Sequence, residues 1–196
     1  MRYEKGRKDV SRRRITTVAA ERFRTDGIAA SGITGIMSDA GLTNGAFYPH
    51  FQSKADLVRE SLAAALDNQS VQLREALAAG GLDAVVDTYL SAAHRDDPAT
   101  GCASAALLPE IARQPLETRA LYTERVLGLA AQLAEALPPQ ARDAQDVVLG
   151  VFATLIGALQ LARAVSSEAL SDRILAAAAE AARLQVQPLG ASAPEA

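Results

Sequence analysis

Apolar residues recur at helical spacing along the chain, and glycine or proline separates one such segment from the next. The first segment carries an apolar stripe at positions i, i+3, i+4 and i+8, formed by Ile15, Val18, Ala19 and Phe23. This spacing predicts a helix over about residues 9–26. Gly27 is expected to end that helix, because glycine readily adopts the left-handed conformation that closes many helix C-termini.

Two short helices and one long helix are predicted next. The first short helix has Ser31 as its N-cap, and the second has Thr43 as its N-cap and continues to about residue 50. The long helix follows Ser53 in a capping-box pattern with Asp56 at position N3. It is expected to run until Gly80-Gly81 and to join two parts of the chain without a flexible linker.

The remaining chain predicts five further helices, over about residues 82–94, 103–114, 116–137, 141–166 and 170–186. The result is an all-α fold with nine helices. We divide it into a head, a body and a short polar tail that is expected to be disordered. These parts are residues 1–55, 56–187 and 188–196.

Charge differs strongly between the head and the body, although the whole chain carries a net charge of only −3. Residues 1–59 contain 11 Lys and Arg against 6 Asp and Glu, whereas residues 60–196 contain 9 against 17. A basic head on an acidic body indicates that the head alone approaches a polyanion such as DNA. A solvated basic N-terminal segment is the simpler alternative.

The sequence favours a cytoplasmic protein. The single cysteine, Cys102, fits a reducing compartment, and the charged N-terminus has no apolar run typical of a secretory signal. The longest uncharged run, Val147–Ala162, has 16 residues, which is short for a membrane span. We therefore interpret it as a core helix and expect no membrane association.

The segment Gly41–Lys54, GLTNGAFYPHFQSK, has the pattern of a turn followed by a recognition helix. Together with the short amphipathic helix before it, this segment predicts a helix-turn-helix, whose second helix enters the DNA major groove. The longer segment GIAASGITGIMSDAGLTNGAFYPHFQSKADLV resembles the DNA-binding domain of TetR-family transcriptional regulators. The matching positions are Ile36, Ala40-Gly41-Leu42-Thr43, Gly45, Phe47-Tyr48, His50-Phe51, Ser53-Lys54 and Leu57.

This resemblance implies double-stranded operator DNA as a partner and a set of DNA-contacting residues in the head. Asn44 could bridge two groups of adenine, and Lys54 could meet a phosphate at a helix N-terminus. Thr43 could enter the groove or act only as a cap, and Phe47 and Phe51 are expected in the core. The residues that we assign to DNA are Ser31, Thr34, Thr43, Asn44, Gly45, Tyr48, Pro49, His50 and Lys54.

Pro49 departs from the commonest family pattern. Proline has no backbone N–H, so it removes the helical bond to the carbonyl of Gly45 and should shorten the last turn of the recognition helix. Thr34 stands where many family members have a basic residue, which removes one expected phosphate contact.

The resemblance also implies a small-molecule effector that binds in the body. The candidate pocket residues are Tyr89, Cys102, Tyr122, Arg125, Phe152, Ile156 and Gln160. Their spacing fits ordinary core packing equally well. The Gly-Cys start of the segment at 101–115 resembles a family branch in which some members sense electrophiles through that cysteine. A helix N-terminus favours a thiolate, although a buried structural thiol is the alternative.

The last two predicted helices are apolar on wide faces that one small body cannot cover alone. A four-helix seam between two copies would bury them, and the resemblance implies the same homodimer. The residues that we assign to this seam are Val148, Leu155, Leu159, Ile174 and Ala178.

These features favour a ligand-responsive transcriptional regulator, with a repressor expected, over an enzyme. The chain has two histidines, His50 and His94, and shows no P-loop and no G-x-G-x-x-G motif. We therefore expect no catalytic site, no metal and no cofactor. A purely architectural DNA-binding protein would not need the acidic body.

Overall fold

The computed structural model describes residues 2–137 and 145–186. Within that part of the chain every regular element is helical, which confirms the all-α prediction. The predicted tail, 188–196, and residues 141–144 of the predicted helix 141–166 lie outside the described residues. One of the nine predicted helices is a short 3₁₀ turn rather than an α-helix.

The N-terminal elements are α1 (Arg2–Asp26), α2 (Ile33–Asp39) and the 3₁₀ turn η1 (Asn44–Ala46). Helix α1 begins earlier than predicted and ends where Gly27 takes a φ of 86°. Gly41 ends α2 with a φ of 65°. There Gly41 N–H donates to Ser38 and Leu42 N–H donates to Met37, the bonding pattern of a glycine-terminated helix.

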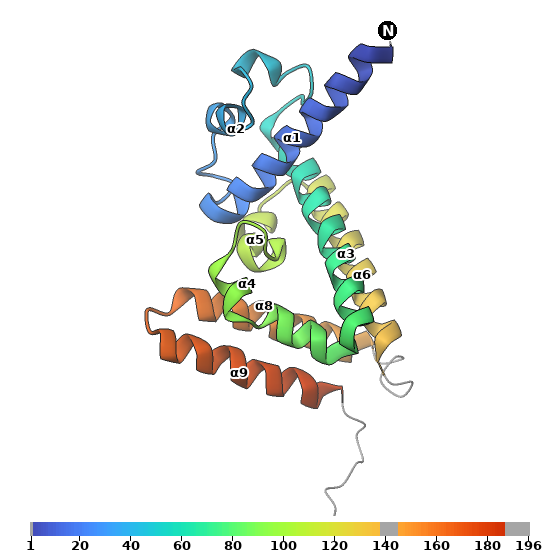
Figure 1. The fold of residues 1–196 in the computed structure, drawn as a ribbon, viewed down its shortest axis with the longest axis vertical. Coiled ribbons are helices and arrows are strands. Elements are labelled where there is room, and N and C mark those ends of the chain that lie inside the picture. Colours follow the sequence, from blue (N-terminus) through green and yellow to red (C-terminus); the bar gives the residue numbers. More distant parts are fainter. Residues whose placement is uncertain (1, 138–144, 187–196) are drawn as a thin grey trace, which may run out of the picture. The chain divides into compact units, whose positions relative to one another are not determined.

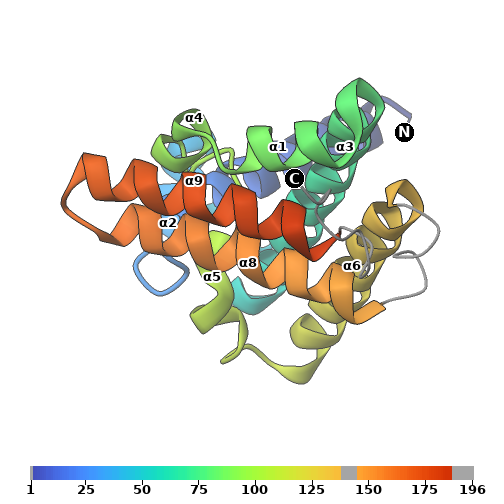
Figure 2. The ribbon, with the colours of Figure 1, turned by 90° about the horizontal axis from the view of Figure 1, so that it is seen from below.

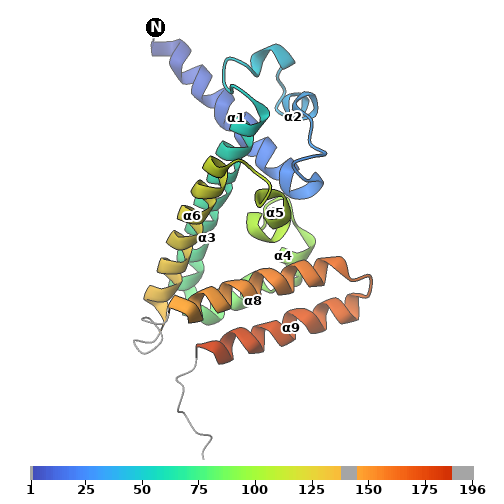
Figure 3. The same cartoon turned by 180° about the vertical axis from the view of Figure 1, so that it is seen from behind.

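The long helix α3 (Lys54–Tyr89) contains the predicted break, because Gly80 and Gly81 both depart from helical geometry. Helix α6 (Leu116–Ala136) runs beside α3, as Figures 1 and 3 show from opposite sides. Arg125 of α6 pairs with Asp67 of α3 at 2.7 Å. The predicted helix over 82–94 ends early, and α4 (Ala92–Asp96) is a separate short helix.

The remaining helices are α5 (Ala103–Ile111), α8 (Gln145–Ala164) and α9 (Glu168–Gln185). Helices α8 and α9 pack side by side in opposite directions, which is clearest in Figure 2. Their connection is fixed by Ser171, whose hydroxyl donates to the carbonyl of Ala162 at 2.7 Å. By length and composition α8 could span a membrane, and 33% of the tested window is buried in the single chain. A single helix of this kind is weak evidence for a membrane span.

Two compact units divide the chain. The first contains residues 1–69 and 97–125, and the second contains residues 70–96 and 126–196. The first unit therefore combines the head with the start of α3, with α5 and with the first half of α6. The division at residue 55 between DNA-binding and effector-binding parts stays a prediction about function.

Candidate nucleic-acid interface

The segment that follows Gly41 is anchored by aromatic side chains. Phe47 is fully buried, Phe51 is 1% exposed, and their ring centroids lie 5.5 Å apart. Both are therefore core residues, as predicted. Ile36 and Met37 of α2 are also fully buried, so the two elements of the helix-turn-helix share one core.

Polar side chains that could touch DNA lie exposed on the same elements. Tyr48 is 73% exposed although the neighbouring Phe47 is buried. The Asn44 amide donates to the Thr34 hydroxyl at 3.1 Å, which joins η1 to α2. The structure thus brings Thr34 and Asn44 together. The exposed members of the predicted set are Thr34, Thr43, Asn44, Gly45, Tyr48 and Pro49.

The recognition segment, residues 43–50, is shorter than an ordinary helix. The N–H of Ala46 donates to Thr43 and that of Phe47 donates to Asn44, which is the i to i+3 pattern of a 3₁₀ turn. Pro49 follows in a turn, in agreement with the expected shortening. Thr43 occupies the N-cap position, but its side chain makes no capping hydrogen bond.

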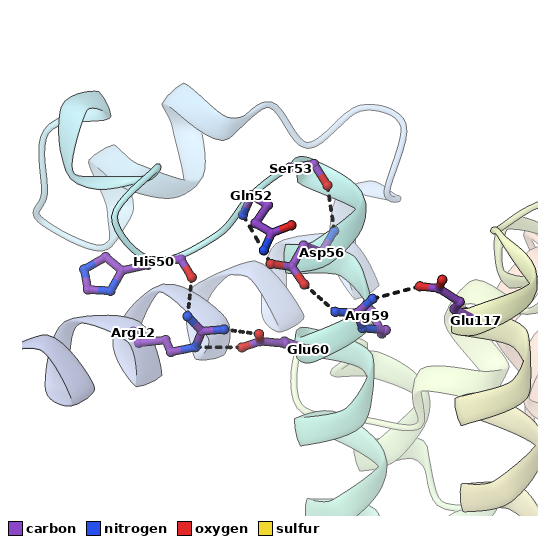
Figure 4. Close-up of polar contacts among 8 residues, drawn as sticks. All are labelled: Arg12, His50, Gln52, Ser53, Asp56, Arg59, Glu60 and Glu117. Atoms are coloured by element: carbon purple, nitrogen blue, oxygen red, sulfur yellow. Dashed lines mark hydrogen bonds and ion pairs between the residues drawn. The ribbon is translucent and has the colours of Figure 1, made fainter.

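Arg12 of α1 fixes the end of this segment, a role that the sequence did not reveal. Its guanidinium bonds both carboxylate oxygens of Glu60 on α3 and donates to the carbonyl of His50 (Figure 4). It also lies over the Phe51 ring, 4.7 Å from the centroid. Arg12 is therefore engaged inside the protein, whereas Lys8, Arg13 and Arg14 are exposed on α1.

The start of α3 is capped by Ser53 as predicted, whereas Asp56 bonds the residue before the cap. The Ser53 hydroxyl accepts the N–H of Asp56 at 3.1 Å, and the Asp56 carboxylate accepts the N–H of Gln52 at 3.2 Å (Figure 4). Arg59 then links Asp56 to Glu117 at the start of α6. The polar contacts of Figure 4 thus join the recognition segment to α1, α3 and α6.

Ser31 does not occupy the predicted position. It is 1% exposed, and its hydroxyl donates to the carbonyl of Gly27 at 2.7 Å. The N-cap of α2 is Gly32, which offers no side-chain cap. The assignment of Ser31 as an N-cap is therefore corrected: its hydroxyl faces backward into the α1–α2 turn. The DNA contact assigned to Ser31 stays a prediction.

Lys54 also makes an internal contact. Its ammonium donates to the carbonyl of Ile28 at 2.5 Å, and its side chain is only partly exposed. An ammonium has three donors, so a phosphate contact remains compatible with this bond. The predicted DNA role of Lys54 stays a prediction.

The lack of a side chain at Gly35 of α2 is explained by a neighbouring residue rather than by backbone geometry. A Cβ at Gly35 would meet the guanidinium group of Arg22. Arg22 pairs with Asp26 on its own helix and with Asp39 at the end of α2, each at 3.2 Å. The glycine therefore makes room for an arginine that ties α2 to α1.

His50 is a titratable group of the recognition segment whose pKa is shifted. Burial, and then the positive charges of Lys8 and Arg12, lower the pKa of His50 below its ordinary value. Its Nδ1 is shielded from solvent without a hydrogen-bond partner. In the folded head the imidazole is therefore neutral near pH 7, and a DNA phosphate would favour its protonated form.

This lowered pKa predicts that the head loses stability in mild acid. The unfolded chain regains the ordinary pKa of about 6.5, so it binds a proton that the folded chain does not bind. The free energy of unfolding should hold its full value above about pH 6.5 and fall as the pH drops through that value. Urea denaturation at about pH 7.5 and about pH 6.0 measures the difference. His50→Gln should reduce the difference in the free energy of unfolding between the two pH values. His94→Gln should leave the contribution of His50 to that difference in place.

The residues predicted to line an effector pocket are divided between the two compact units. Cys102, Tyr122 and Arg125 lie in the first, and Tyr89, Phe152, Ile156 and Gln160 lie in the second. In the first unit the Tyr122 hydroxyl donates to Ser104 at 2.9 Å, and burial raises the pKa of Tyr122. Cys102 is 3% exposed, and its sulfur accepts the Gln69 amide N–H at 3.4 Å.

Three residues predicted for the dimer seam are already buried within one chain. Val148, Leu155 and Leu159 are 1%, 3% and 0% exposed. They therefore belong to the core between α8 and its neighbours within one chain, and their assignment to the dimer seam stays a prediction. Ile174 and Ala178 on α9 remain partly exposed. Leucines that are exposed on these two helices are Leu149, Leu161, Leu170 and Leu184.

The chain is similar to known regulators in both sequence and fold. A sequence profile described as "Bacterial regulatory proteins, tetR family" matches residues 15–61. No curated protein matches the sequence significantly. The reduced form of E. coli NemR has a similar fold, with a TM-score of 0.74 and 18% identity over 92% of this chain and 98% of that chain.

Two further solved structures share the fold. A TetR-family transcriptional regulator from Cytophaga hutchinsonii has a TM-score of 0.75 and 19% identity, covering 90% of this chain and 95% of that chain. Bacillus subtilis FadR in complex with stearoyl-CoA has a TM-score of 0.63 and 16% identity, covering 90% of this chain and 98% of that chain.

Proposed function

Because the chain belongs to the TetR family of bacterial regulatory proteins, we propose that it is a homodimeric repressor released from a palindromic operator by a small-molecule effector. The main support is the exposed surface of residues 43–49, which lies on an aromatic core. Tyr48 and Asn44 face solvent there, while Phe47 holds the segment in place.

Each exposed group suits a part of the DNA. The Tyr48 hydroxyl can donate to a phosphate, which sets the register of the protein on the duplex. The Asn44 amide can pair with adenine in the major groove and so contribute base preference. The excess of Lys and Arg over residues 1–59 adds attraction to the phosphates.

A second copy of the chain would cover apolar surface on the second unit. Leu161 of α8 is 59% exposed, and Leu184 of α9 is 63% exposed. Exposed leucines on two adjacent apolar helices are typical of a protein–protein interface. A two-fold dimer would place two heads on half-sites about 34 Å apart, one helical turn of DNA.

The effector would act by changing the spacing between the two heads of the dimer. Polar groups that could recognise it lie inside the first unit, where Tyr122 bonds Ser104 and Gln69 bonds Cys102. An effector that binds better to a conformer with displaced heads would lower the affinity for the operator by linkage.

The proposal is tested by selecting binding sites from random duplex DNA with the full-length protein. The enriched sequences should contain an inverted repeat whose half-sites lie about one or two helical turns apart. Enrichment of no common sequence, or of a single half-site without symmetry, would rule out the proposed operator.

A thiol-sensing repressor is the second candidate function. Cys102 is the N-cap of α5, and its sulfur accepts the N–H of Ala105 at 3.5 Å. The thiol is the group of this residue that an electrophile would modify. An adduct would need space that the buried side chain lacks and would displace the start of α5.

Treatment with N-ethylmaleimide separates the two candidates. If Cys102 is a sensor, the wild-type protein should release its operator after alkylation, measured by fluorescence anisotropy of labelled DNA. Cys102→Ser keeps a capping group but has no thiol, so it should retain the operator. Release from both proteins, or from neither, would show that Cys102 has only a structural role. The signal would then be the non-covalent effector.

A further inference from the structure

A carboxylate on α5 holds the turn between α1 and α2. Glu110 accepts hydrogen bonds from two consecutive backbone N–H groups. That of Ile28 reaches Oε2 at 3.1 Å, and that of Ala29 reaches Oε1 at 3.0 Å. Bonds to a charged acceptor are stronger than bonds between neutral groups. The Ile28 side chain is buried as well, so both backbone and side chain fix this turn.

The neighbouring residues fit the same contact. A Cβ at Gly27 would lie 3.2 Å from the nearer Glu110 oxygen, so the glycine permits both the positive φ and the approach of the carboxylate. The carbonyl of Ile28 accepts from Lys54 of α3. The backbone N–H of Ile28 is therefore bound by Glu110 of α5, and its carbonyl is bound by Lys54 of α3.

The opposite end of α5 is attached to α1. Arg24, in the last turn of α1, donates from Nε to the carbonyl of Ala99 at 2.7 Å. Ala99 lies three residues before Cys102, the N-cap of α5. Helix α5 thus contacts the head near both of its ends, and it lies beside the C-terminal half of α1 in Figures 1 and 3.

The space between α1, α3 and α5 is closely packed. The cavity there has a volume of about 10 Å³, lined in part by Phe23, Val58 and Leu107. That volume is about the size needed for one water molecule. A closely packed junction transmits a displacement instead of absorbing it, because its side chains have no room to rearrange.

We infer that Glu110 is a positioning residue for DNA binding. Its carboxylate sets the position of the α1–α2 turn and, through the turn, of α2 and the exposed residues that follow it. A displacement of α5 is carried to the DNA-reading surface by this contact. The inference rests on the proposed function for its DNA readout, but the contact itself can be measured without DNA.

Glu110→Gln is the direct test. Glutamine has nearly the same size, but it presents one acceptor and one donor to two N–H groups, so at least one bond is lost. Amide hydrogen exchange followed by NMR should show faster exchange at Ile28 and Ala29, by a factor of about ten. Affinity for the selected operator should fall by a similar factor, about tenfold, with the same salt dependence because no phosphate contact is removed.

Considered by charge alone, Glu110→Gln would change DNA affinity in the opposite direction. Removing a negative charge from a DNA-binding protein should strengthen binding or leave it unchanged. Glu124→Gln is the matched control, because Glu124 is an exposed residue of α6 that pairs with its neighbour Arg125. This control should show equal or slightly tighter binding and unchanged exchange at Ile28 and Ala29.

Glu110→Asp keeps the charge but shortens the side chain, so it separates geometry from charge. It should behave like Glu110→Gln in both measurements. Wild-type exchange rates at Ile28 and Ala29 in both variants would overturn the inference, as would wild-type operator affinity in both. If the wild-type protein binds no palindromic DNA, the proposed function fails, while the exchange rates still decide whether Glu110 holds the turn.

Discussion

Replacing Leu161 or Leu184 by aspartate is expected to convert the dimer to a monomer and to lower operator affinity by a factor of about 100 or more. Both side chains are more than half exposed on the single chain, so an aspartate there need not disturb the protomer core. In the proposed dimer it would bury an unpaired charge. The monomer then loses the second half-site. Light scattering measures the assembly, and fluorescence anisotropy measures binding.

Leu116→Asp is the matched control for this experiment. Leu116 is 76% exposed at the start of α6, outside the proposed interface. It should leave both the dimer and the operator affinity unchanged. Leu155→Asp would be a poor test, because Leu155 is buried within the protomer and its replacement should unfold the second unit. Variants at Leu161 and Leu184 that stay dimeric would place the interface elsewhere.

Two substitutions on the recognition segment should affect DNA binding in different ways. Tyr48→Phe removes one hydroxyl that is proposed to bind phosphate, so affinity should fall about fivefold on every sequence. Asn44→Ala should instead relax the preference at one base pair in each half-site, where discrimination of about 1–3 kcal/mol would be lost. Binding to an operator and to its single-base variants separates the two effects.

Asn68→Ala provides the control for Asn44→Ala. Asn68 is an exposed residue of α3 outside the recognition segment. Asn68→Ala makes the same chemical change as Asn44→Ala. It should preserve both affinity and base preference. If Asn44→Ala binds every operator variant with the wild-type order of affinities, then Asn44 does not read a base.

The local features of the fold could be predicted because each depends on a few adjacent residues. Gly27 and Gly41 require a positive φ at helix ends, and both positions follow an apolar helical stripe. At the break in α3, Gly81 likewise has a positive φ of 64°. The capping bonds of Ser53 and Asp56 span only three or four residues, so their spacing revealed them.

The contacts that position the candidate site could not be predicted in this way. Arg12 and Glu60 are 48 residues apart, and Glu110 is more than 80 residues from the turn that it holds. Nothing in their local pattern distinguishes them from solvated charges. Ser31 was misassigned for a related reason: a serine before a helix fits an N-cap, but its hydroxyl bonds backward to Gly27.

The central claim, that this chain is a sequence-specific DNA-binding dimer, is tested most directly by its affinity for two duplexes. One carries the selected palindrome, and the other carries the same bases in scrambled order, both measured at about 150 mM salt and at several higher concentrations. We expect tighter binding to the palindrome by a factor of about 1,000 or more, with affinity for both duplexes falling steeply as salt rises. Equal affinity for the two duplexes would contradict it.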